Sequence, residues 1–183
     1  MTKPHLFMVG GAKGVGKTRL TSDLSSELGL ERVETGKIVL DYVAQGLPLD
    51  RLTNHLTREL ISRNNALILD THFARYSDRE EQDKQFMRGM ETEDLERLLD
   101  VFHIHLCLVE VQLHELERRR KNDQKRRPLG LFYIQQEIEF NQRGYALYLR
   151  DLPQEPFILL NDDYTIAKAR LAHWVMQHHK RLC

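Results

Sequence analysis

The residues that could do chemistry begin with one glycine-rich segment. It reads Gly11-Ala12-Lys13-Gly14-Val15-Gly16-Lys17-Thr18 and matches the pattern G-x-x-x-x-G-K-[ST]. Glycines allow successive backbone amides to point at one centre and allow phosphate oxygens to approach closely. Lys17 would bridge the terminal phosphates of a nucleotide, and the Thr18 hydroxyl would bind Mg²⁺. The segment therefore predicts a nucleoside triphosphate site; the alternative is a chance match in a strand-to-helix turn.

A carboxylate that could share a metal ion with Thr18 follows a later apolar run. Asp70 comes directly after Ala66–Leu69, four apolar residues that are typical of a buried strand. In phosphate-loop enzymes such an aspartate holds Mg²⁺, usually through water. Asp70 is therefore the leading second metal ligand, with Glu110 on a later strand as a weaker rival. The alternative is that Asp70 opens a turn or caps a helix.

Short apolar runs alternate with longer segments of helical periodicity along the chain. The apolar runs predict strands at 5–10, 32–35, 66–69, 103–111 and 157–160. The periodic segments predict helices at 20–28, 37–45, 50–63, the later part of 78–100, 113–121, 131–149 and 167–175. This alternation predicts an α/β fold, a parallel sheet covered by helices on both faces. Since no repeat or long linker divides the chain, we expect a single domain over residues 1–183.

A strongly basic segment follows the fourth predicted strand. Residues 118–127 hold seven Lys or Arg side chains and one acid. Phosphoryl transfer spreads negative charge over the moving group, and the planar fork of arginine grips phosphate oxygens in pairs. A basic lid that closes over bound substrates would also exclude water, and we expect Arg119, Arg127 and Arg143 to make its phosphate contacts. A solvated helix end and a nucleic-acid patch are the alternatives.

Three short motifs together resemble nucleoside monophosphate kinases, specifically the short adenylate kinases of archaeal type. They are Thr35-Gly36 near the end of the second predicted strand, Asp70-Thr71-His72 after the third, and the basic run 118–127 followed by Asn141-Gln142-Arg143. The resemblance spans nearly the whole chain. It implies a three-layer P-loop fold whose five-stranded parallel sheet has the strand order 2-3-1-4-5. It also implies two excursions, at about 36–65 and 120–131, that close over nucleotides.

The same resemblance implies a set of site residues. ATP would be bound by the loop from Gly11 to Thr18, with Asn161 in the loop that passes the adenine ring. The acceptor would be bound by Thr35, Gly36, His72 and Arg75. His72 could hydrogen-bond an acceptor phosphate or a lytic water, or it could be a satisfied polar residue in a turn. For Asn161 a plain turn is the alternative.

This chain departs from the adenylate kinase pattern at three positions. Lys13 stands where the loop often has proline, and Arg19 stands where a second threonine is frequent. Leu40 stands where common adenylate kinases have an arginine that grips the monophosphate, a task that Arg75 or Arg51 could take over. These differences concern the acceptor more than ATP.

The overall composition is that of an ordinary water-soluble protein. The 183 residues carry 27 Lys+Arg and 27 Asp+Glu, so the formal net charge is zero. This balance disfavours a nucleic-acid partner, because it excludes a generally cationic surface. The two cysteines provide no disulfide framework, and we expect a cytoplasmic protein with no membrane segment. His103 and His105 read as core or sheet-face residues, whereas His178 and His179 are expected to face solvent.

The leading hypothesis is a kinase that uses ATP and Mg²⁺ to phosphorylate a nucleoside monophosphate, with AMP as the first acceptor. In-line attack by the acceptor phosphate needs no protein nucleophile. The alternatives are a kinase of another small molecule or of a polynucleotide end, and an ATPase or ATP-binding regulatory module. Since archaeal-type adenylate kinases often assemble as trimers, a homo-oligomer is possible by resemblance.

Overall fold

The central strand β1 (His5–Gly10) is buried along its whole length. It pairs in parallel with β3 (Leu67–Asp70) on one side and with β6 (His103–Glu110) on the other. Because its side chains alternate between two covered faces, Phe7 packs in one hydrophobic cluster and Met8 in the other. A strand buried on both faces must be almost continuously apolar, which is the pattern that the sequence shows here.

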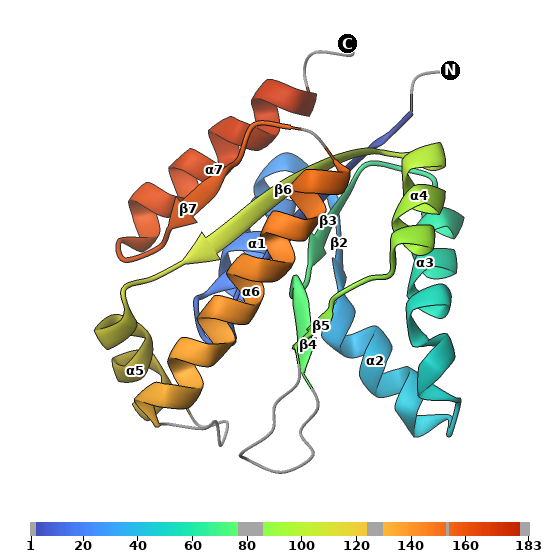
Figure 1. Cartoon of the computed structure of the whole chain (residues 1–183). Coiled ribbons are helices and arrows are strands. Elements are labelled where there is room, and N and C mark those ends of the chain that lie inside the picture. Colours follow the sequence, from blue (N-terminus) through green and yellow to red (C-terminus); the bar gives the residue numbers. More distant parts are fainter. Residues whose placement is uncertain (1–2, 77–85, 124–129, 153, 180–183) are drawn as a thin grey trace.

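The structure is a computed structural model that describes residues 3–76, 86–123, 130–152 and 154–179. Its main sheet has five parallel strands in the order β2-β3-β1-β6-β7, where β2 is Glu31–Glu34 and β7 is Ile158–Leu160 (Figure 1). The predicted five-stranded parallel sheet is confirmed. The strand numbers differ from the predicted order because a separate antiparallel hairpin, β4 (Ala74–Tyr76) with β5 (Phe86–Arg88), comes between the third and fourth strands of the sheet.

Helices cover both faces of this sheet (Figure 1). They are α1 (Lys17–Leu28), α2 (Thr35–Ala44), α3 (Leu52–Arg63), α4 (Thr92–Val101), α5 (Leu113–Lys121), α6 (Leu131–Asp151) and α7 (Tyr164–His179), with a 3-10 turn η1 at Leu49–Arg51. Side chains of α1 and α7 pack in one hydrophobic cluster, and side chains of α3, α4 and the later part of α6 pack in the other. None of the helices in the described residues is long and apolar enough to cross a membrane.

Apart from shifts of one to four residues at other helix and strand ends, the structure differs from the predictions at three places. The second strand is Glu31–Glu34 rather than 32–35, so Thr35 is the first residue of α2. The hairpin β4–β5 was not predicted, because each of its strands has only three residues and the pairing joins separate parts of the chain. His178 and His179 are half-buried on α7 rather than exposed, since they pack against histidines of the sheet.

Candidate active site

The glycine-rich loop connects the end of β1 to the start of α1, which is where a phosphate-binding loop belongs. Gly11, Gly14 and Gly16 all have positive φ angles, of 148°, 91° and 94°. At Gly16 a Cβ atom would lie 2.5 Å from Nδ2 of Asn161, so a side chain would be both strained and crowded there. The glycines of the pattern are therefore required by the backbone path of this loop.

Lys17 is folded back over the loop. Its ammonium Nζ donates hydrogen bonds to the carbonyl oxygens of Gly11 at 2.7 Å and Ala12 at 2.9 Å. Only 6% of Lys17 is exposed, so the charge is held by the loop rather than by solvent. The structure thus places the predicted phosphate-bridging cation against the loop itself, beside the N-terminal end of α1, whose dipole also favours anions.

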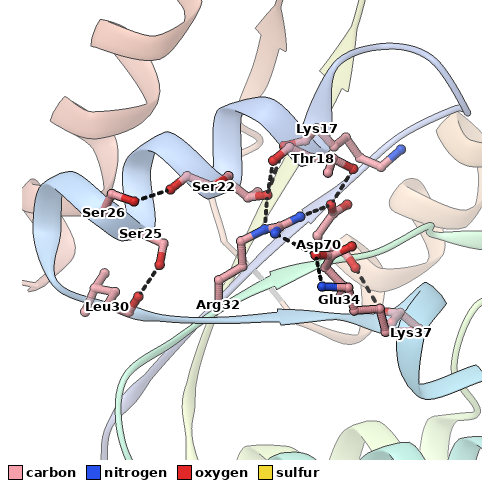
Figure 2. Close-up of polar contacts among 12 residues, drawn as sticks. Lys17, Thr18, Ser22, Ser25, Ser26, Leu30, Arg32, Glu34, Lys37 and Asp70 are labelled. Atoms are coloured by element: carbon pink, nitrogen blue, oxygen red, sulfur yellow. Dashed lines mark hydrogen bonds and ion pairs between the residues drawn. The ribbon is translucent and has the colours of Figure 1, made fainter. Parts of the chain in front are cut away.

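Thr18 and Asp70 are brought together from elements far apart in the sequence. The Thr18 hydroxyl donates a hydrogen bond to Oδ2 of Asp70 at 2.8 Å (Figure 2). Asp70 is the last residue of β3, and it is only 8% exposed. A hydroxyl and a carboxylate are hard oxygen donors of the kind that Mg²⁺ prefers, so this pair fits the expected metal. Its rival Glu110 instead accepts a hydrogen bond from Gln142 on α6 at 2.7 Å.

Arg32 belongs to this site, although its role was not predicted. From β2 its guanidinium contacts Asp70 Oδ2 at 3.0 Å, Glu34 Oε1 at 2.7 Å and the Thr21 hydroxyl at 2.8 Å. The signal in the sequence was an arginine two residues before Glu34, because such a pair shares one face of a strand. The hydrogen bond from Lys37 and the charge of Arg32 lower the pKa of Glu34 below its ordinary value.

Arg119 and Asn161 hold the phosphate loop from the side of β7. Arg119 donates to the carbonyl oxygens of Val15 at 3.3 Å and Asn161 at 2.6 Å, and it pairs with Glu115 at 2.7 Å. The side-chain amide of Asn161 donates to the same Val15 carbonyl at 2.7 Å. Both predicted residues therefore lie against the loop, where they contact its backbone.

A second arginine, Arg120, was not singled out from the sequence. Its guanidinium donates two hydrogen bonds to the Lys13 carbonyl, at 3.1 and 2.8 Å, and it forms an ion pair with Glu137 of α6. The side chains of Arg120 and Glu137 are 0% and 2% exposed. Helical spacing could have shown this, because Arg120 lies four residues after the buried Leu116 and so shares its face of α5. This buried pair ties the phosphate loop to α5 and α6.

A cavity of about 710 Å³ opens beside the phosphate loop. It is lined by residues of β1, the loop, α2, α3, the segment from β3 into β4, the segment after β5, and α6: Met8, Lys13, Thr35, Gly36, Val39, Leu40, Leu52, Thr53, Leu56, Thr71, His72, Ala74, Gly89, Met90 and Tyr148. Three predicted acceptor residues are among them. Thr35 donates to the Asp70 carbonyl at 3.0 Å, and Nδ1 of His72 donates to the Gly11 carbonyl at 2.7 Å. The cavity is therefore joined directly to the phosphate loop.

The structure places the remaining predicted residues less directly. Arg75 lies in β4 of the hairpin, and its side chain is outside the part of the chain that the structure describes. Arg127 lies outside the described residues. Arg143 is exposed on α6, with its guanidinium 4.3 Å from the ring centre of Phe86 in β5, so a cation–π contact holds it against the hairpin.

Comparison with known proteins identifies the fold. No family model matches the sequence, and no curated protein matches it. Among solved structures, an inferred kinase from Chloroflexus aurantiacus has a TM-score of 0.62 at 20% identity, covering 99% of this chain and 98% of that one. Shikimate kinase from Bacteroides thetaiotaomicron has a TM-score of 0.60 at 13% identity (93% and 98%), and a gluconokinase from Sinorhizobium meliloti 1021 has 0.55 at 14% (97% and 99%). The chain therefore has the fold of the P-loop kinases.

Proposed function

We propose that this protein is an ATP-dependent phosphotransferase that transfers the γ-phosphoryl group of ATP to a nucleoside monophosphate, with AMP as the first acceptor to test. The observation that carries this proposal is the cavity of about 710 Å³ that adjoins the phosphate loop. Lys13 belongs to both the loop and the cavity lining. A donor phosphate on the loop and an acceptor in the cavity would therefore be neighbours, as direct transfer requires.

The lining of the cavity supports a base-containing acceptor. Its walls away from the loop are largely apolar, with Val39, Leu40, Leu52, Leu56 and Met90 among them. A flat heteroaromatic base gains from such walls, whereas a polyhydroxylated acid would leave hydroxyl groups without hydrogen-bond partners there. The polar groups Lys13, Thr35 and His72 lie toward the loop, where an acceptor phosphate would have to be.

The chain itself would contribute positioning and positive charge. Lys17 and the loop amides would hold the donor phosphates, and Arg119 would add a second cation from α5. Mg²⁺, held by Thr18 and Asp70, would supply charge neutralisation between the phosphates. Arg127 and Arg143 are proposed as lid cations, and the excursions at 36–65 and 120–131 as the parts that close over the nucleotides.

A second candidate acceptor class comes from the structural neighbours. Two of them are described as a shikimate kinase and a gluconokinase, names that indicate small hydroxylated acids as acceptors. The same loop could serve such an acceptor, because the phosphate-donor half of the site does not depend on what receives the group. An ATPase or ATP-binding regulatory module is the alternative that needs no acceptor.

One experiment separates these functions. Purified protein with ATP and Mg²⁺ is offered AMP, CMP, UMP, GMP, dTMP, shikimate and gluconate in turn, with Lys17→Ala as the inactive control. We expect transfer to a nucleoside monophosphate that is lost in the control. Transfer only to shikimate or gluconate would replace the acceptor class, and ATP hydrolysis that ignores every acceptor would favour the ATPase module.

A further inference from the structure

Arg32 occupies the centre of a polar network at the carboxyl end of β2 (Figure 2). Its guanidinium uses three separate nitrogens: Nε contacts Thr21, Nη1 contacts Glu34 and Nη2 contacts Asp70. The side chain is 15% exposed, and its anchor Thr21 is fully buried on α1. An arginine held at three points in a fixed fork has little freedom, so its position is set by the fold.

The contact with Asp70 acts on the same oxygen that Thr18 uses. Oδ2 of Asp70 accepts one hydrogen bond from the Thr18 hydroxyl at 2.8 Å and one from Nη2 of Arg32 at 3.0 Å. Two donors that converge on one oxygen from α1 and β2 define the orientation of the carboxylate. Arg32 thus orients the Asp70 carboxylate beside the Thr18 hydroxyl, and these two groups would bind the metal ion of a nucleotide complex.

The charges around this carboxylate are balanced before any metal arrives. Asp70 and Glu34 carry two negative charges, and Arg32 and Lys37 lie within ion-pair distance of them, at 3.0 Å for Arg32 to Asp70 and 2.9 Å for Lys37 to Glu34. Lys17 adds a further positive charge at the start of α1. A bare divalent cation would therefore meet little net attraction here, whereas nucleotide phosphates on the loop would change the local charge to negative.

We propose that Arg32 is a positioning residue that orients Asp70 toward Thr18 and offsets its charge, so that a divalent cation binds together with nucleotide phosphates and not alone. This inference rests on the proposed nucleotide site. The measurable consequence is a strong coupling between metal and nucleotide, and coupling between two ligands is reciprocal. Arg32 contributes to that coupling through Asp70 and does not touch the reacting groups.

The test measures Mn²⁺ binding by electron paramagnetic resonance, with and without a non-hydrolysable ATP analogue. The ratio of the two affinities is compared between wild type and Arg32→Met. We expect the variant to bind bare Mn²⁺ more tightly and to lose about tenfold in this ratio, because both the charge and the second donor to Asp70 are gone. Lys37→Met is the matched control. It removes the cation that pairs with Glu34 rather than with Asp70, and because the Lys37 side chain is 72% exposed, solvent screens its charge, so the ratio should stay within about twofold of wild type.

Three results would overturn the inference. The ratio of Arg32→Met could equal that of wild type, or Lys37→Met could lose as much as Arg32→Met, which would indicate general surface charge. Arg32→Lys keeps the charge without the fork, so it should keep weak binding of bare Mn²⁺ while losing at least about threefold in the ratio; an unchanged ratio contradicts the proposal even if Arg32→Met fails to fold.

The outcome is separable from that of the proposed function. A wild-type protein that couples Mn²⁺ to the analogue but phosphorylates no acceptor would reject phosphoryl transfer and leave the role of Arg32 standing. A wild-type protein that does not bind the analogue would overturn the nucleotide site and this inference with it.

Discussion

The two ends of β1 are surrounded by different kinds of polar side chain. At its carboxyl end lies the phosphate loop, where Lys17, Arg32 and Asp70 are held by ion pairs and hydrogen bonds. At its amino end five histidines gather from β1, β6 and α7: His5, His103, His105, His178 and His179. Both ends bring polar groups from distant parts of the chain together, but they treat charge in different ways.

Two residues of the histidine end, His5 and His105, are neutral at pH 7. Nδ1 of His5 and Nε2 of His105 lie 2.7 Å apart, and the rings of His105 and His178 have centroids 4.2 Å apart. Burial and the neighbouring histidines lower the pKa of His105 to about 3 and that of His5 to about 4. No group of three or more His, Cys, Asp or Glu side chains in the described residues is arranged to hold a metal ion.

This difference suggests a functional division between the two ends of β1. In open α/β sheets ligands bind at the carboxyl ends of the strands, because the loops there leave a crevice and the helix dipoles point toward it. At the opposite edge, the polar groups instead pack against one another as aromatic rings. We therefore expect changes at the loop end to affect activity and changes at the histidine end to affect stability.

Glu137→Ala is the variant that should depart most from this division. Glu137 lies at the loop end, but the substitution should mainly lower the stability of the protein. The change leaves Arg120 buried without its carboxylate, and we expect the free energy of unfolding to fall by about 3–5 kcal/mol. Urea denaturation measures it. Glu139→Ala on the same helix is the matched exposed control, and it should cost no more than about 0.5 kcal/mol; equal losses would show that the buried pair does not stabilise the loop.

Lys17→Ala should show the division in its simplest form. Removing the cation from the loop should lower turnover by about 10²–10³-fold, the range found when one preorganised donor to a developing charge is lost. The free energy of unfolding should change by less than about 1 kcal/mol, because the Lys17 ammonium binds carbonyl oxygens of the loop rather than the hydrophobic core. Steady-state kinetics and urea denaturation measure the two effects, and a large loss of stability would contradict the division.

The histidine end should make the free energy of unfolding depend on pH. Since the folded-state pKa values of His5 and His105 lie below the ordinary 6.5, unfolding takes up protons, so their stabilisation is complete above pH 6.5 and is lost as the pH falls toward 4. At about 1.4 kcal/mol per pKa unit, the two groups together correspond to at most about 6 kcal/mol over this range. Solvent screening at the partly exposed rings reduces this value, so we expect wild type to lose at least about 2 kcal/mol more than the double variant His5→Phe/His105→Phe.

Urea denaturation at a series of pH values tests this. The double variant should keep wild-type turnover at pH 7, since neither residue lies near the cavity or the loop. If the free energies of unfolding of the two proteins change with pH in parallel, His5 and His105 do not titrate in this range and the prediction is wrong.

The smallest expected effect concerns Lys13 in the acceptor cavity. Lys13→Met should raise the KM for the acceptor about fivefold, because one cation near the expected acceptor phosphate is removed. The KM for ATP should change by less than about twofold, since the Lys13 backbone, held by Arg120, is kept. Initial rates at saturating ATP measure the first value, and an equal rise in both would assign Lys13 to the donor side.

Much of the fold could be predicted from the sequence because its signals are local. The strand at 5–10 and the helix at 113–121 match the structure in both bounds, since apolar runs and helical spacing depend on neighbouring residues. The hairpin β4–β5 could not be found this way, because its pairing depends on a return of the chain rather than on a pattern in either strand.

The candidate site divides in the same manner. Lys17 and Thr18 were found from eight consecutive residues, and Asp70 from its place after an apolar run. Arg32 and Glu137 were missed, because their importance comes from partners 38 and 17 residues away. A charged residue within a short strand is an ambiguous signal until the neighbouring strand is known.

The sequence by itself determined the phosphate loop and the alternation of strands and helices. The glycines, the lysine and the threonine of the loop lie in one continuous segment, and the backbone conformations that they require follow from local sterics. Only the tertiary structure decided that Arg32 shares Asp70 with Thr18, that Arg120 and Glu137 hold the loop, and that five histidines meet at the opposite edge. These groupings depend on the order β2-β3-β1-β6-β7, and strand order is set by the packing of the whole sheet rather than by any one segment.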